Sequence, residues 1–230
     1  IEINETRIEL FDKILQNKVI NIFFVIFCMM VLINGGNFID GLNGLLLTYF
    51  LVVFSIISLN FSDFHFVDKE FLINLITVLS IILVLNILGF LYMGDSGAYL
   101  LSFIAGYYLI EFSSNNIAIS PYFIIVLLWY PCFELLFSMI RRSSKDIKTY
   151  KPDTLHLHQM IYVYFKKKLN TNNNRIFHLY SSIIINFYNA IVFYIAINFI
   201  YRSEVLISII ILNIVVYLII YSVLKNKKFS

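Results

Sequence analysis

The chain has 230 residues, of which 60% are hydrophobic, 17% aromatic and 13% charged, and its formal net charge is +3. Because soluble domains carry about 25% charged residues, this composition excludes an ordinary soluble domain and predicts a protein embedded in a lipid bilayer. The apolar runs are about 16 to 22 residues long and lack the alternation of barrel strands, which excludes a β-barrel. We therefore expect an all-α polytopic membrane protein with about seven transmembrane helices.

Polar and apolar segments follow one another along the chain. Residues 1–18 mix acids, amides and bases, and they are predicted to form a juxtamembrane segment with a short surface helix. Residues 19–230 are expected to form a single transmembrane domain with a cytoplasmic loop at 141–180. The seven expected spans are 19–33, 44–60, 71–92, 97–112, 121–140, 181–201 and 205–224.

Lysines and arginines are distributed unevenly between the two sides of this predicted topology. The side that holds residues 35–43, 93–96, 141–180 and the C-terminal tail carries twelve of the 17 basic residues, and the other side carries five. By the positive-inside rule the first side is cytoplasmic. Three polar interruptions of the apolar pattern lie on that side, as one composite site requires. We expect the protein in the cell (inner, cytoplasmic) membrane, with its site facing the cytoplasm.

The first interruption, residues 34–45, lies between two spans and contains four glycines. Gly35 and Gly36 are expected to let the chain leave the first helix, since glycine carries no Cβ. Asp40 is the only acid of the stretch, and Asn37 lies one helical turn before it. An acid this close to the hydrocarbon indicates a functional site. The alternative is a glycine-rich hairpin in which Asp40 only caps a helix.

The second interruption places Asp95 within the sequence MGDSGAY, at the mouth of two spans. An isolated carboxylate flanked by glycines suits a hard cation that keeps water and also contacts phosphate oxygens, as Mg²⁺ does. The alternative is a turn aspartate that caps the following helix.

The third interruption, residues 152–159, contains His156 and His158. Asp153 follows a proline and predicts the N-cap of a short helix, whose N-terminus would attract phosphate. The nearby bases are Lys151, Arg141 and Arg142. The histidines could donate to a pyrophosphate or position a base. Two alternatives stay open: zinc held by Asp153 and the histidines, which lacks a fourth ligand, and a basic loop drawn to anionic lipid.

Three further ionisable residues carry no motif. Glu134 lies within a span and is expected to form a structural ion pair with a base or to extend toward the interface. His65 and His178 lie in polar connectors. All three are left out of the predicted site.

Taken together, the three interruptions resemble the motifs of one family, the polyprenyl-phosphate N-acetylhexosamine-1-phosphate transferases. These are the membrane glycosyltransferases of family 4 related to MraY and WecA. The family pattern N-x-x-N-x-x-D-G-x-D-G-L is matched by residues 34–45, with Asn43 in place of the second aspartate. The pattern N…F-x-G-D-x-G-S is matched at Asn86 and around Asp95, with an alanine for the final serine. The pattern P-D-x-x-H-x-H is matched by residues 152–158.

The resemblance implies transfer of a sugar-1-phosphate from a UDP-sugar to a polyprenyl phosphate such as undecaprenyl phosphate. UMP is released, and the product serves cell-envelope polysaccharide biosynthesis, either cell wall or lipopolysaccharide. The implied cofactor is Mg²⁺, with Mn²⁺ as an alternative. By this resemblance Asp95 and Asn37 hold the metal, and Asp40 is catalytic or lies near the lipid phosphate. Substrate contacts are expected from Asn34, Asn86, Arg141, Arg142, Lys151, Asp153, His156 and His158.

The implied partners are a UDP-N-acetylhexosamine donor, a polyprenyl phosphate acceptor and the lipid bilayer; no nucleic acid is expected, and a homodimer is left open. The family carries an Asp-Asp motif on an earlier cytoplasmic loop, and these 230 residues contain no Asp-Asp pair. We therefore expect further N-terminal helices in the full enzyme, and no activity from this fragment alone. The alternatives are a non-catalytic family member and a small multi-pass transporter, although the paired breaks of a transporter repeat are missing.

Overall fold

The computed structural model describes residues 2–61, 69–143, 155–169 and 173–229. Within these ranges all regular structure is helical, which confirms the all-α class. The helices are α1 (Glu9–Leu15), α2 (Lys18–Ile39), α3 (Leu45–Asn60), α4 (Lys69–Ile87), α5 (Gly94–Asn115), α6 (Pro121–Ser143), α7 (Leu157–Lys168), α8 (Asn174–Ile197) and α9 (Ser203–Phe229).

Among the described residues, five helices are long and apolar enough to cross a membrane, so the expected number of about seven spans is wrong. The five are Lys18–Ile39, Glu70–Ile87, Pro121–Ser143, Asn174–Ile197 and Ser203–Asn226. Helix α3 has 16 residues and is about 24 Å long, which is shorter than the roughly 30 Å hydrocarbon layer. Helix α5 has 22 residues, but it begins with the polar sequence GDSG and also contains Glu111.

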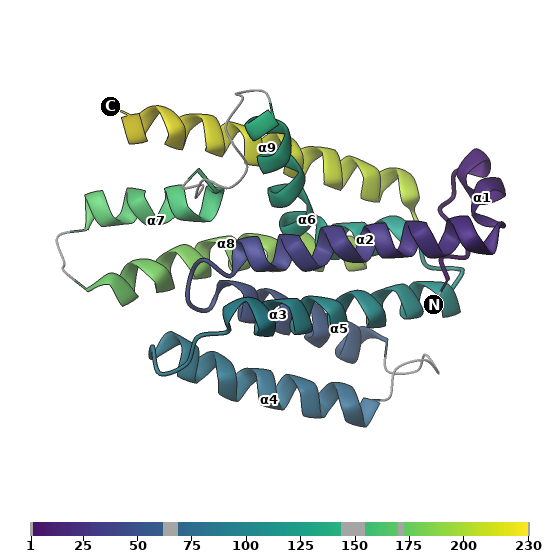
Figure 1. Ribbon diagram of the computed structural model, residues 1–230, viewed down its shortest axis with the longest axis horizontal. Coiled ribbons are helices and arrows are strands. Elements are labelled where there is room, and N and C mark those ends of the chain that lie inside the picture. The colour runs from purple at the N-terminus through teal and green to yellow at the C-terminus, as the bar shows by residue number, and fades with distance from the viewer. Residues whose placement is uncertain (1, 62–68, 144–154, 170–172, 230) are drawn as a thin grey trace.

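The connections between these helices alternate between the two ends of the bundle (Figure 1). The α2–α3 loop, the α4–α5 turn, α7 and the start of α8 lie at one end, on the left of Figure 1. Helix α1 and the N-terminus lie at the other end. The described parts of the three polar interruptions therefore share one end of the molecule, as the alternation of spans predicts. The predicted polar segment 141–180 contains α7 and the first turns of α8.

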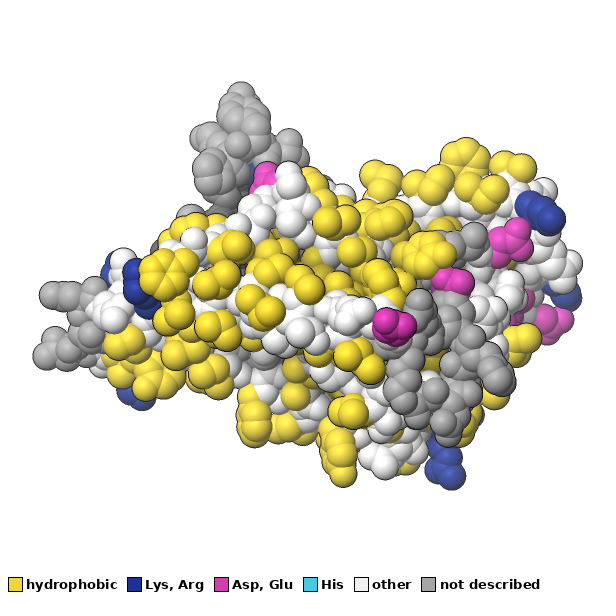
Figure 2. All heavy atoms as spheres, turned by 90° about the horizontal axis from the view of Figure 1, so that it is seen from below, with side chains coloured by type: hydrophobic (Ala, Val, Ile, Leu, Met, Phe, Trp, Pro, Cys, Tyr) yellow, Lys and Arg dark blue, Asp and Glu magenta, His cyan; other side chains and the backbone are white. Residues whose placement is uncertain are grey.

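Hydrophobic side chains cover much of the outside of the bundle. On α4, five such residues are between 40% and 59% exposed: Phe71, Ile73, Val78, Ile81 and Val84. Figure 2 shows hydrophobic side chains over most of one face, with lysines and arginines toward its ends. So large an apolar surface matches lipid and would be unusual on a protein in water. The outside of the bundle therefore supports membrane embedding.

Helix α2 does not end at Gly35 and Gly36, as the sequence predicted, but continues to Ile39. The two glycines instead allow neighbouring helices to approach closely. A Cβ at residue 35 would collide with the backbone carbonyl of Pro131 in α6, and one at residue 36 with the hydroxyl of Ser102 in α5. Small residues of this kind are typical of helix contacts within membranes.

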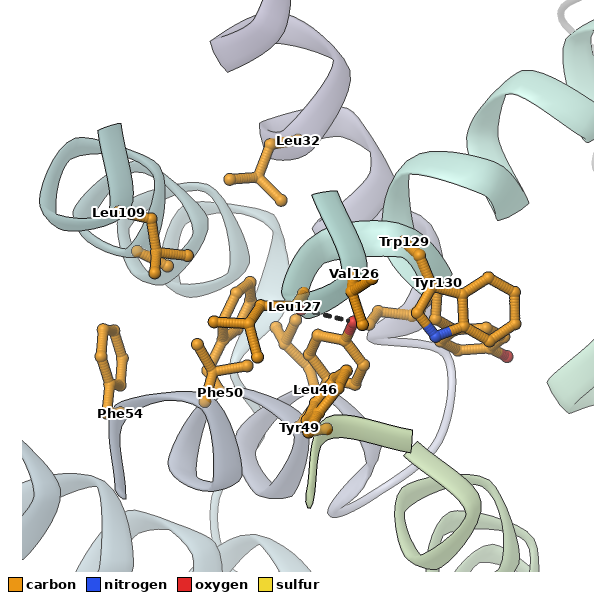
Figure 3. Packing of buried hydrophobic residues seen from close by; sticks show 14 of the residues in the cluster. Leu32, Leu46, Tyr49, Phe50, Phe54, Leu109, Val126, Leu127, Trp129 and Tyr130 are labelled. Atoms are coloured by element: carbon orange, nitrogen blue, oxygen red, sulfur yellow. Dashed lines mark hydrogen bonds between the residues drawn. The ribbon is translucent and has the colours of Figure 1, made fainter. Parts of the chain in front are cut away.

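Helix α3 is short but central. Tyr49, Phe50 and Phe54 are at most 1% exposed. Figure 3 shows them packed with residues of α5 and α6, among them Leu109 and Val126. Because α3 is surrounded by protein, its backbone ends need not reach the two membrane surfaces.

Helix α6 contains Pro131. Proline has no N–H group, so the carbonyl of Leu127, four residues earlier, loses its helical donor. Tyr49 of α3 replaces that donor, because its hydroxyl donates to the Leu127 carbonyl at 2.8 Å (Figure 3). Beyond the proline, the second half of α6 turns away from the direction of its first half (Figure 1). This half carries Glu134 and Arg141 toward α7 and α9.

Candidate active site

The acidic loop, which we define as residues 40–44, connects α2 to α3 at the polar end of the bundle. It begins with Asp40, the C-cap of α2, whose N–H donates to the carbonyls of Gly36 and Asn37. It ends at Gly44, whose φ of +82° lies in the left-handed region that favours glycine. A five-residue loop thus reverses the chain and leaves Asp40 at the end of one helix.

The backbone of the acidic loop is held by side chains from α4 and α8. Gly44 N–H donates to Oδ1 of Asn86 at 2.6 Å, and Asn43 N–H donates to Nδ1 of His178 at 3.2 Å. The Asn43 carbonyl accepts from the hydroxyl of Ser182 at 2.8 Å. The Asn43 amide also donates to the Asn86 carbonyl at 3.0 Å, which an ionised aspartate could not do. This bond gives a physical reason why residue 43 is asparagine, where the family pattern has its second aspartate.

Two residues predicted to bind substrate have their amide groups engaged within the protein. Asn86 is 3% exposed, and its amide nitrogen donates to the Leu91 carbonyl at 2.9 Å. Asn86 therefore ties the acidic loop to the turn after α4. Asn34 is exposed and donates to the Met30 carbonyl of its own helix at 2.7 Å. Both contacts stabilise local structure.

Asp40 and Asp95 are close enough to influence each other. Burial of the Asp40 carboxyl, and second to it the charge of Asp95, raises the pKa of Asp40 to about 7. Asp95 is exposed in the first turn of α5, where the helix dipole favours negative charge. Asn37 lies in the last turn of α2, and its amide nitrogen donates at 3.3 Å to the hydroxyl of Tyr99, which is four residues after Asp95 in α5. The three residues predicted from the first two motifs therefore come together where α2 ends and α5 begins.

The chemistry of this group fits a hard divalent cation. Carboxylate and amide oxygens are ligands of Mg²⁺, which needs only one or two carboxylates when substrate phosphates complete its shell. Burial is the main cause of the raised pKa of Asp40, and the nearby charge of Asp95 adds to it; a cation between the two carboxylates would oppose both effects. Within the described ranges, no three His, Cys, Asp or Glu side chains gather closely enough to enclose a metal by themselves. A site built by the protein and the substrate together is consistent with that finding.

The histidine loop, which we define as residues 155–159, leads into α7. The predicted short helix is present, but it begins at Leu157, with His156 as its extended N-cap residue. Asp153, the predicted N-cap, and Lys151 lie outside the described residues. Because the backbone at His156 is extended, the rings of His156 and His158 stack, with centroids 5.5 Å apart.

His158 is fully buried beside the acidic loop. A Cβ built on Gly41 would lie 2.9 Å from its Nε2 atom. Burial lowers the pKa of His158 to about 4, with Glu134 opposing and His156 adding to that shift. Both ring nitrogens lack a hydrogen-bond partner among the described residues. The ring of His158 is thus the part of the histidine loop that lies against the acidic loop.

His156 is anchored by Glu134, which the sequence did not assign to the site. The Glu134 carboxylate is 0% exposed and lies 3.0 Å from Nδ1 of His156. A base was expected as its partner, and the basic side chain of His156 takes that place. Arg141 donates to the Ser138 hydroxyl at 3.4 Å. That hydroxyl lies 3.3 Å from the same nitrogen of His156. Arg141 is thus buried near the histidine loop, and its contact with substrate stays a prediction.

Sequence patterns missed Glu134, His178 and Tyr99. Tyr99 closes the second interruption but was given no role there, and the other two belong to no motif; each meets its partner across a long sequence separation, for example 135 residues between Asn43 and His178. The sequence offered one signal, which was Glu134 itself. An acid within an apolar helix indicates a buried partner, because a buried carboxylate needs one.

Comparison with known proteins identifies relatives of part of this chain. Residues 1–113 match the family described as Glycosyl transferase family 4. The undecaprenyl-phosphate alpha-N-acetylglucosaminyl 1-phosphate transferase of Escherichia coli (strain K12) is 30% identical over 146 residues, which are 60% of this chain and 40% of that protein. The protein of the same name from Yersinia pestis is 28% identical over 143 residues, which are 59% of this chain and 39% of that protein. The matches thus span about two fifths of these curated relatives. No solved structure matches the chain.

Proposed function

We propose that this chain, whose residues 1–113 match glycosyl transferase family 4, takes part in sugar-1-phosphate transfer from a UDP-sugar to a polyprenyl phosphate. UMP is the second product. The observation that carries the proposal is the meeting of Asp40, Asp95 and Asn37 at one end of the bundle, beside two stacked histidines. Acids and amides placed this way suit a reaction between two phosphate groups.

The metal in this proposal is Mg²⁺, held by Asp95 and Asn37 with Asp40 nearby. When bound, it would neutralise phosphate charge while UMP is displaced from the phosphorus of the transferred group. Asp95 remains accessible for this role because it is exposed in the first turn of α5. The bond between Asn37 and Tyr99 orients the amide whose oxygen is the ligand atom.

Asp40 has a pKa suited to proton transfer at neutral pH. A phosphate monoester has a second pKa of about 6, so the acceptor still carries a proton in part of the population. In our proposal Asp40 takes that proton. The acceptor oxygen then bonds to the sugar-linked phosphorus of the donor. The bond from that phosphorus to the bridging oxygen breaks, and the electron pair leaves with UMP.

The donor is proposed to lie against the histidine loop and the bases near it. Arg141 is buried beside this loop, and α7 begins there with a helix N-terminus that favours phosphate. The hydrophobic outside of the bundle suits an acceptor that stays in the bilayer. We place the reaction at the cytoplasmic face of the cell membrane, in envelope polysaccharide biosynthesis.

The test is release of UMP by the complete gene product in detergent, supplied with undecaprenyl phosphate, Mg²⁺ and a panel of UDP-sugars. The name of the curated relatives makes UDP-N-acetylglucosamine the first donor to try. We expect metal-dependent UMP release that Asp40→Asn abolishes. Glu204→Gln is the matched control, because Glu204 is an exposed acid at the opposite end of the bundle. Absence of UMP with every donor would refute the proposed function.

A further inference from the structure

Glu134 is an ionisable residue that the proposed reaction does not use. It lies in α6, three residues after Pro131, and its side chain is 0% exposed. A buried carboxylate within an apolar helix is costly unless its oxygens accept hydrogen bonds. Among the described residues, both oxygens do so, and their partners come from α7, its N-cap residue and α9.

One carboxylate oxygen binds two consecutive residues of the histidine loop. Oε1 lies 3.0 Å from Nδ1 of His156 and accepts from the backbone N–H of Leu157 at 3.3 Å. Leu157 is the first residue of α7, where N–H groups have no partner within the helix. Glu134 therefore caps α7 from another helix and holds the preceding ring at the same time.

The carboxylate also selects one form of the His156 ring. Oε1 already accepts from the Leu157 N–H, so the geometry assigns Nδ1 of His156 as the second donor to the same oxygen. The second oxygen, Oε2, accepts from the hydroxyl of Tyr217 in α9 at 2.9 Å. This bond is an additional contact of the carboxylate, while the Leu157 N–H keeps Oε1 beside His156. The ring is thus fixed in tautomer and in direction.

The position of His156 is passed on to the acidic loop through ring contacts. Its ring packs edge-on against Phe38 of α2, with centroids 5.1 Å apart, two residues before Asp40. Its other neighbour is the stacked ring of His158, which lies against Gly41. A shift of His156 would therefore move groups on both sides of the proposed reaction site.

We propose that Glu134 is a positioning residue for the diphosphate of the nucleotide-sugar donor. It acts through His156: it fixes the Nδ1–H tautomer and the start of α7, and so aligns the stacked histidines opposite the acidic loop. This inference rests on the proposed function. It adds a residue remote from the motifs. Replacing this residue should change the KM for the donor and leave the KM for the lipid acceptor nearly unchanged.

The test compares three variants of the complete protein. Glu134→Met keeps the side-chain volume and removes both acceptors. Glu134→Gln keeps one oxygen acceptor and should rescue the wild-type behaviour. Tyr217→Phe removes one bond to the same carboxylate and leaves His156 in contact with it. The rescue variant keeps the test valid if Glu134→Met fails to fold, because Glu134→Gln must then retain wild-type kinetics and tautomer.

Two measurements separate positioning from general stabilisation. Nitrogen-15 histidine spectra should show Nδ1–H for His156 in the wild type and Glu134→Gln, and mixed tautomers in Glu134→Met; the chain has only four histidines, so single replacements assign the signals. Steady-state kinetics should show that Glu134→Met raises the KM for the UDP-sugar about tenfold, while the KM for the polyprenyl phosphate changes less than about twofold.

Three outcomes would overturn the inference. One is an unchanged His156 tautomer in Glu134→Met. Another is an unchanged donor KM in that variant, and the third is an equal rise in both KM values. Tyr217→Phe must also retain a donor KM within about threefold of the wild type, since an equal effect there would indicate mere stabilisation. A wild-type protein that releases no UMP refutes the proposed function instead, and the spectra still report whether Glu134 sets the tautomer.

Discussion

The acidic loop and the histidine loop meet at the same end of the bundle, but they are held in different ways. The acidic loop is held through its backbone, by Asn86 from α4 and by His178 and Ser182 from α8. The histidine loop is held by Glu134, whose single oxygen Oε1 contacts both His156 and Leu157. Three side chains thus share the acidic loop, whereas the contacts of His156 and Leu157 with Oε1 both depend on one carboxylate.

This difference has a consequence for the effect of substitutions. A net hydrogen bond contributes about 0.5–1.5 kcal/mol, so the acidic loop should survive the loss of one anchor with reduced stability. The histidine loop should lose its alignment when Glu134 alone is replaced. The backbone of the acidic loop is thus fixed for Asp40, whose side chain does the proposed chemistry. In the histidine loop, the anchored side chain of His156 is itself proposed to contact the nucleotide-sugar donor.

The largest expected effect comes from a substitution that leaves both sets of anchors intact. Asp95→Asn removes the exposed carboxylate and none of the bonds that hold the loops. We expect loss of Mg²⁺-dependent UMP release by at least about a thousandfold, because a metal supplies several kcal/mol to such a step. The melting temperature should stay within a few degrees of the wild type. Activity close to the wild type would show that Asp95 does not hold the metal.

The next effect tests the several anchors of the acidic loop. Asn86→Ala removes the acceptor of Gly44 N–H and the donor to Leu91, and leaves one buried N–H without its partner. The free energy of unfolding in mixed micelles should fall by about 1–3 kcal/mol. Asn34→Ala is the matched control, since it removes an exposed bond within α2. Equal losses in the two variants would contradict the anchoring role.

A smaller effect is expected where the two loops touch. Gly41→Ala places a methyl group 2.9 Å from Nε2 of His158 and must displace that ring. We expect the KM for the UDP-sugar to rise about tenfold. In a protein that already carries His158→Ala, the same change should add little, because the ring is gone. Additive effects in the double variant would show that the contact does not couple the loops.

The smallest effect is a pair of opposite pH dependences in metal-free protein. The pKa of Asp40 is raised to about 7, so its contribution to stability is present below pH 4 and is lost as the pH rises toward 7. The pKa of His158 is lowered to about 4, so its contribution is present above pH 6.5 and is lost as the pH falls toward 4. The two groups therefore oppose each other across the same range.

Melting temperatures from pH 4 to pH 7, measured with a chelator, should separate these two contributions. Relative to the wild type, Asp40→Asn should gain stability as the pH rises, and His158→Phe should gain stability as the pH falls. Differences that follow the same direction in both variants would contradict the opposite shifts. Restoring Mg²⁺ should weaken the pH dependence of the melting temperature that Asp40 causes, because a cation favours the ionised carboxylate.

The parts of the site that sequence predicted are those that depend on local pattern and chain direction. Asp40, Asn37 and Asp95 lie next to helix ends, and the alternation of spans places those ends together. The link between Glu134 and His156 could not be read in this way. It depends on Pro131, which redirects the second half of α6, and on α9, whose Tyr217 is 83 residues from Glu134.

The number of spans was misjudged for a related reason. Hydropathy measures how apolar a segment is and does not report what surrounds it. Helix α3 reads as a span, yet Phe50 and Phe54 are buried by other helices, and its 16 residues are too few to cross the hydrocarbon layer. Likewise Gly35 and Gly36 indicated a helix end, because close approach of a neighbouring helix leaves the same signature as a turn.

The bond from Tyr49 to the Leu127 carbonyl bears on the order in which the protein can assemble. Without it, the proline of α6 would expose an unpaired carbonyl to hydrocarbon, which costs several kcal/mol. Helix α3 is synthesised before α6, so its phenol is already in the membrane when α6 arrives. Biogenesis in the order of translation thus supplies the missing donor at the time it is needed. A circular permutant that delivers α6 before α3 should insert poorly, even though its finished structure would contain the same contacts.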